Sequence, residues 1–88
     1  MKQFSVSASA PTNYQLNAIS FFGTPIRQSD GSLLVSIVFD TEDDAKAYLH
    51  QKVNNGSVDF EDTDSVHECI EELGYMTYDG ITAIIDAI

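Results

Sequence analysis

The most apolar stretch of the chain is Leu33–Phe39, which reads LLVSIVF and is interrupted only by Ser36. A short run that is apolar on both faces and rich in β-branched residues is typical of a strand buried on both sides. We therefore expect it to be the central, most buried strand of a sheet. Pro25–Arg27 precede it across Ser29–Gly31, whose composition suits the loop of a hairpin.

Residues 3–10 read QFSVSASA, so polar and apolar side chains alternate with period two. This alternation predicts a half-buried strand, with the apolar side chains on one face and the serines on the other. Pro11 comes directly after the stretch and ends it.

The segment Tyr14–Phe22 fits two structures. Some of its apolar residues alternate as in a strand, but others recur at helical spacing, with Thr12 or Asn13 as the N-cap and Gly23 as the end. Aromatic and β-branched residues dominate its second half, so we favour a strand. A helix here would instead give a β-α-β-β arrangement.

Beyond residue 40 the apolar residues recur at three- and four-residue spacing. This pattern predicts three helices, over about 41–53, 63–73 and 80–88. Residues suited to N-caps lie at their expected starts: Asp40 or Thr41, Asp62 or Asp64, and Asp79.

The last of these three segments also fits a strand. Isoleucine is common in strands, and Asp79-Gly80 could close a hairpin between 75–78 and 81–85. We favour the helix because four isoleucines repeat the helical spacing, at Ile81, Ile84, Ile85 and Ile88.

The sequence thus predicts one α+β domain over residues 1–88. An antiparallel sheet of about three strands, from residues 3–39, carries the three helices on one face. The helices are expected to pack on it through apolar side chains: Ala45, Tyr48, Leu49, Val66, Ile70, Leu73, Ile81, Ile84, Ile85 and Ile88.

Acidic residues outnumber basic ones by fourteen to four, which gives a formal net charge of −10. Eleven of the acids lie between Asp40 and Glu72, where only Lys46 and Lys52 oppose them. This charge repels nucleic-acid phosphates and anionic membranes, so we expect direct binding to neither. It attracts basic partners, including proteins or nucleoprotein complexes that hold DNA or RNA.

Cys69 is the only cysteine, which excludes an internal disulfide and a cysteine-rich zinc site. The sequence has neither an apolar run of about 20 residues, as a membrane span requires, nor the apolar core of a secretion signal. We therefore expect a cytoplasmic protein.

The sequence offers no catalytic motif. His67, Glu68 and Cys69 are adjacent, and adjacent positions on a helix point about 100° apart, so they cannot converge on one metal ion. His67 and Glu71 have ligand spacing, but two ligands make a weak site. The five glycines are scattered singly, so none forms a phosphate-binding loop. We expect no enzyme, no metal site and no cofactor.

The second predicted helix carries four acids opposite its apolar side, which we name the acidic ridge: Asp64, Glu68, Glu71 and Glu72. Two of its i,i+4 pairs are like-charged, each destabilising by about 0.2–0.5 kcal/mol, and the helix contains no cation to offset them. Acids at this spacing lie about 5–6 Å apart, comparable with successive phosphates of a nucleic-acid strand. The ridge therefore suits a basic groove that normally holds nucleic acid. Solubility alone is the competing explanation.

The chain resembles the small, acidic, single-domain inhibitors encoded by phages and mobile elements, including anti-CRISPR proteins. The resemblance rests on length, on the acids at 40–44 and 59–72, and on the α+β pattern without a catalytic motif. It implies a protein of a bacterial host cell that inhibits a Cas protein or complex, which some members bind by mimicking nucleic acid. An acidic antitoxin or a phage accessory protein would look similar. The charge pattern assigns partner binding to nine acids: Asp64, Glu68, Glu71, Glu72, Asp59, Glu61, Asp62, Asp43 and Asp44.

A structural or oligomerisation module is the second hypothesis. Contact would then run through the exposed edge of the strand at 3–10, or through Tyr75, Met76 and Tyr78 before the last helix. A homo-oligomer is compatible with both hypotheses, since an inhibitor can also be dimeric.

Overall fold

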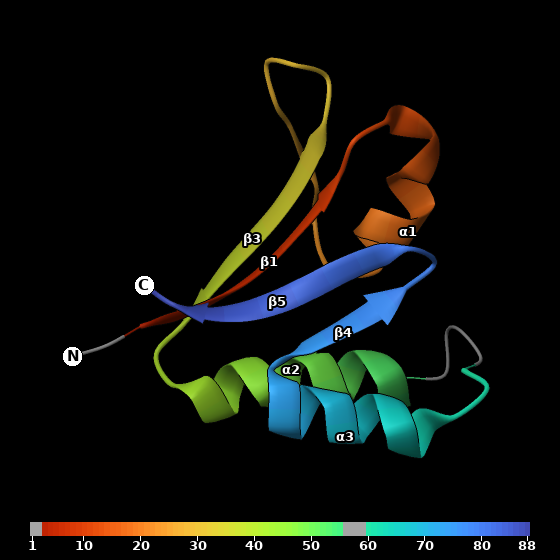
Figure 1. Cartoon of the computed structure of the whole chain (residues 1–88). Coiled ribbons are helices and arrows are strands. Elements are labelled where there is room, and N and C mark those ends of the chain that lie inside the picture. Colours follow the sequence, from red (N-terminus) through yellow and green to blue (C-terminus); the bar gives the residue numbers. More distant parts are fainter. Residues whose placement is uncertain (1–2, 56–59) are drawn as a thin grey trace.

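A computed structural model describes residues 3–55 and 60–88 and shows an α+β fold (Figure 1). Five strands form one antiparallel sheet in the order β2-β3-β1-β5-β4. The elements are, in chain order, β1 (Phe4–Ala10), a 3-10 turn (Asn13–Gln15), α1 (Leu16–Ser20), β2 (Ile26–Arg27), β3 (Leu33–Phe39), α2 (Glu42–Asn54), α3 (Thr63–Leu73), β4 (Tyr75–Tyr78) and β5 (Ile81–Ala87). The predicted class is confirmed, but the sheet has five strands rather than about three.

The middle strand of the sheet is β1, which pairs with β3 on one side and with β5 on the other. Its predicted alternation is confirmed, since Val6, Ala8 and Ala10 are buried and the serines face the other way. The expectation that β3 is central and buried on both faces is wrong: β3 lies next to the centre, and its Val38 is 53% exposed. The helices cover only one face of the sheet, so the β3 side chains on the other face are exposed even where they are apolar.

The segment Tyr14–Phe22 is helical, so the favoured strand is wrong and the alternative is confirmed. The 3-10 turn runs directly into α1. Helical spacing then brings Ala18, Ile19 and Phe22 into the core, where each is at most 3% exposed. Burial of this side of α1 outweighs the β propensity of its aromatic and β-branched residues, since propensity is a weak preference that tertiary packing overrides.

The helix expected over 80–88 is also wrong, because these residues form β5 in a hairpin with β4. Asp79 and Gly80 both have positive φ, 51° and 83°, as the two-residue turn of such a hairpin requires. The second edge of β1 needs hydrogen-bonding partners, and β5 provides them. Strand alternation then buries Ile81 and Ala83.

The core joins the inner face of the sheet to the inner sides of the helices. Seven of the expected core residues take part in it: Ala45, Leu49, Ile70 and Ile81 are buried, and Tyr48, Val66 and Ile85 pack against them. Leu73, Ile84 and Ile88 are instead exposed by 65%, 45% and 67%, so their assignment to the core is wrong. Alternation in β5 turns Ile84 to the open face, and Leu73 lies on a flank of α3 that the sheet does not cover.

Both long helices begin at predicted caps. The Thr41 hydroxyl accepts a hydrogen bond from the Asp44 N–H at 3.1 Å, and the Asp62 carboxylate accepts one from the Ser65 N–H at 3.0 Å. Gly74 ends α3 in a left-handed conformation with φ of 73°. Among the described residues, no helix is both long and apolar enough to cross a membrane.

Candidate partner-binding site

Three carboxylates of α3 are exposed at successive i,i+4 positions: Asp64, Glu68 and Glu72. We name them the outer row. The opposite side of α3 carries Val66 and Ile70, which pack into the core. Within residues 3–55 and 60–88, no ion pair or hydrogen bond is made by a carboxylate of the outer row. These three acids are therefore available to an external partner.

Glu71, the fourth member of the predicted ridge, faces α2 instead. Its carboxylate lies 3.8 Å from the Lys46 ammonium and 2.7 Å from Nε2 of His50. The same ammonium donates to the Glu71 carbonyl at 2.9 Å and pairs with Glu42 at 3.3 Å, as the i,i+4 spacing of that pair implies. Because α2 and α3 lie side by side (Figure 1), the cation that α3 lacks is provided by α2. Glu71 therefore lies on a different flank of α3 from the outer row.

A chain of polar contacts continues across the two helices. Nδ1 of His50 lies 2.6 Å from Nδ1 of His67, so one imidazole donates and the other accepts. Nε2 of His67 lies 3.1 Å from Oδ1 of Asn54. The half-buried His67 is thus part of the helix–helix contact and not an isolated surface histidine. In the described part of the chain, no three His, Cys, Asp or Glu side chains are placed to hold a metal ion.

The other predicted site acids that the structure describes lie outside α3. Asp62 caps α3, Glu61 is exposed just before it, and Asp59 lies outside the described residues. Asp43 and Asp44 are exposed in the first turn of α2. Asp44 lines a groove beside β3, on the other side of α2 from the contact with α3.

The surfaces expected for an oligomerisation module are largely covered. Both edges of β1 are paired, so the strand at 3–10 exposes no edge. Met76 is 1% exposed, and the Tyr78 ring packs 4.5 Å from the ring of Phe21. Of the three residues expected before the last element, only Tyr75 and Tyr78 have partly accessible side chains.

A third side of α3 carries Cys69, which is half-buried beside Tyr75 of β4. Hydrogen bonding with the Cys69 side chain, and then the negative charge of its thiolate, raise the pKa of Tyr75 above its ordinary value. The nearest histidine along the helix, His67, is held by His50 and Asn54. Cys69 therefore has no histidine base placed to activate it in the described part of the chain.

Comparisons with protein-family models, with curated proteins and with solved structures give no match. Sequence reasoning missed the contact between α2 and α3, in which Lys46 pairs with Glu71, 25 positions further along the chain. Spacing within one helix carries no signal for such a pair.

Proposed function

We propose that the protein is a small acidic binding protein that inhibits a basic, nucleic-acid-handling protein or complex by charge mimicry. The inhibitor class is the phage-encoded, anti-CRISPR type. The observation that supports this proposal is the outer row, with its three exposed carboxylates that lack partners among the described residues. Their two like-charge pairs each cost about 0.2–0.5 kcal/mol, and a helix selected only for stability would place lysines among them.

The length of the outer row suits a nucleic-acid channel. Eight residues separate Asp64 from Glu72, which is about 12 Å along a helix that rises about 1.5 Å per residue. A nucleic-acid strand rises about 3.4 Å per nucleotide, so the row spans about three to four phosphates. Lysine and arginine side chains that bind such a stretch of nucleic-acid backbone can pair with these carboxylates instead.

The net charge of −10 supports the same function over longer distances. A single-sign field steers an oppositely charged partner and raises the association rate. Salt screens this attraction, since the Debye length is about 8 Å at 0.15 M ionic strength. We therefore expect association with the target to slow as salt is raised.

The test measures DNA cleavage by a panel of purified, guide-loaded Cas nucleases, with and without the protein. The native chain is expected to inhibit at least one complex. The variant D64N/E68Q/E72Q should inhibit that complex about 10- to 100-fold less well, because three charge contacts are lost. The control D30N/D79N/D86N removes the same number of charges from two turns and from β5, and it should inhibit like the native chain.

Two results would contradict the proposal. The first is the absence of inhibition of any complex in the panel. The second is equal inhibition by the two triple variants, which would show that the outer row has no role beyond that of acids elsewhere on the chain. Circular dichroism of both variants confirms that each is folded before their inhibition is compared.

A further inference from the structure

The outer side of β3 is paired over only part of its length. β2 pairs with it through Ile26 opposite Leu34 and Arg27 opposite Leu33. On the other side, β1 pairs with all of β3. Among the described residues, no strand lies against the outer edge of the four residues Ser36–Phe39.

The register of the sheet shows which backbone groups face this free edge. The Gln3 carbonyl accepts a hydrogen bond from the Ile88 N–H at 2.8 Å, so odd-numbered residues of β1 face β5 and even-numbered ones face β3. Their partners on β3 are odd-numbered, so Ser36 and Val38 direct their N–H and C=O groups outward. No residue within 3–55 or 60–88 provides a backbone partner for these groups on the outer side.

This edge lacks the features that usually protect sheet edges, which are charges, prolines, bulges and short strands. The two outer strands of the sheet do have such features, because β2 is two residues long and follows Pro25 and β4 has only four residues. Ser36–Phe39 contains neither a charge nor a proline, and Val38 is 53% exposed. The edge therefore remains competent to pair with another extended chain.

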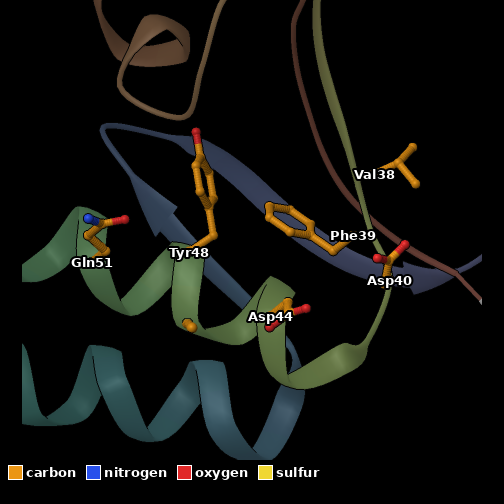
Figure 2. Close-up of a pocket in the computed structure, with 7 residues that line it drawn as sticks. Val38, Phe39, Asp40, Asp44, Tyr48 and Gln51 are labelled. Atoms are coloured by element: carbon orange, nitrogen blue, oxygen red, sulfur yellow. The ribbon is translucent and has the colours of Figure 1, made fainter.

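A groove of about 580 Å³ lies beside the same edge, between the end of β3 and α2 (Figure 2). Its lining residues are Val38, Phe39, Asp40, Asp44, Ala47, Tyr48 and Gln51. The rings of Phe39 and Tyr48 lie 5.3 Å apart and form an aromatic wall. The Tyr48 hydroxyl donates to the Phe22 carbonyl at 2.6 Å, which fixes the position of this ring. The groove therefore presents an aromatic surface to an apolar side chain, beside the Lys52 ammonium, which lies 5.1 Å from the centre of the Tyr48 ring.

The charge at the groove selects among occupants. Asp40 and Asp44 are exposed at its rim and make no ion pair with any described residue. A second copy of the chain carries −10 and the same two acids, so pairing of two such edges is opposed by repulsion. An extended segment with lysine or arginine side chains is complementary to the rim.

We propose that the free edge of β3 and its groove dock an extended, basic segment of a partner protein by strand addition. The segment pairs with the outward groups of Ser36 and Val38. Alternate side chains then lie over the groove, where an apolar one contacts Phe39 and Tyr48 and a basic one approaches Asp40 or Asp44. This site is separate from the outer row, which lies on α3 at the far side of α2.

The probe for this site is the acetylated, amidated peptide TKTFTKT, titrated into the isotopically labelled full chain and followed by NMR. Its lysines and phenylalanine share one side of an extended chain. Saturable shifts are expected at the amides of Ser36 and Val38 and at the Tyr48 ring. A peptide N-methylated at the positions that face β3 keeps its charge but loses these donors, so it should bind about tenfold more weakly. The peptide TETFTET should not bind detectably.

Two protein variants test the same site. Val38→Pro removes an outward N–H but no hydrogen bond to β1, and it should weaken binding of TKTFTKT about tenfold. D40N/D44N leaves the strand unchanged and should weaken binding several-fold, so the test does not depend on whether the proline variant folds. D64N/E68Q/E72Q should bind the peptide like the native chain, which separates this site from the proposed inhibitory surface.

Equal binding of TKTFTKT and its N-methylated form would refute strand addition. Shifts confined to α3 would show that the peptide binds the outer row instead, and would also overturn the inference. Light scattering completes the experiment. A dimer that Val38→Pro dissociates would assign the edge to a second copy of the chain and not to a basic segment.

Discussion

The two flanks of α3 carry the same type of residue in different surroundings. On the flank facing α2, Glu71 lies within 3.8 Å of Lys46 and 2.7 Å of His50. One residue further on, Glu72 belongs to the outer row, which has no partner among the described residues. A rotation of about 100° about the helix axis separates the two carboxylates.

This comparison shows that acidity alone does not define a binding surface. The inner carboxylate stabilises the contact between two helices, so removing it should mainly affect folding. The outer carboxylates repel each other and pair with no described residue, so removing them should mainly affect binding. Changes on the flank facing α2 are therefore expected to alter mainly stability, and changes in the outer row are expected to alter mainly inhibition.

The largest expected change in stability comes from Glu71→Ala. It removes one ion pair and one hydrogen bond to a histidine, and should lower the free energy of unfolding by about 1 kcal/mol. The Glu71 side chain is 57% exposed, so solvent screening keeps the effect from being larger. Urea denaturation followed by circular dichroism measures it.

Glu72→Ala is the matched control, because it removes the same side chain from the same turn of the same helix. It should leave stability unchanged or raise it slightly, since one like-charge pair disappears. Equal losses of stability in the two variants would abolish the distinction between the flanks. A double-mutant cycle between His50→Ala and Glu71→Ala should give a coupling that the cycle with Glu72→Ala lacks.

An effect of similar size but opposite sign is expected for Glu68→Lys. The change replaces two like-charge i,i+4 pairs by two opposite-charge pairs, so the free energy of unfolding should rise by about 1 kcal/mol. The same variant should lose inhibition in the cleavage assay, because a cation now stands in the middle of the outer row. A variant that is less stable than the native chain would indicate that Glu68 has a structural role after all.

The smallest effect concerns the third side of α3. Hydrogen bonding with Cys69 raises the pKa of Tyr75, so the folded state favours the neutral phenol. This contribution to stability is present below about pH 10, the ordinary value for tyrosine, and is lost as the pH rises through the higher folded value. Cys69→Ala should return the pKa of Tyr75 toward its ordinary value. The absorbance of tyrosinate during an alkaline titration measures the shift, and Glu72→Ala should not produce it.

Local sequence patterns predicted the elements that are buried on one side and exposed on the other. The alternation of residues 3–10 predicted a half-buried strand, and the apolar spacing of 63–73 predicted α3 with its cap at Asp62. The i,i+4 pair of Glu42 and Lys46 was equally predictable. In each case the residues that decide the outcome lie within one or two turns of each other.

Predictions failed where one pattern is compatible with two structures. Tyr14–Phe22 and 80–88 carry apolar residues at both strand and helix spacing. The first segment contains α1, which packs on the sheet, and the second contains β5, which completes the sheet. The contacts of Glu71 could not be predicted for a related reason, since its partners Lys46 and His50 belong to another helix. The free edge of β3 was not foreseen either, because it depends on where β2 stops.

The α+β class, the two long helices with their caps, and the excess of negative charge can all be read from the amino-acid order. These properties depend on composition and on neighbours a few residues apart, which act in the same way whatever the rest of the chain does. Three other properties follow only from the folded chain: β1 is the centre of the sheet, residues 81–87 pair with it, and certain acids of α3 are left for a partner. These outcomes require hydrogen bonds and ion pairs between segments far apart in the chain, and such contacts exist only once the whole core has assembled.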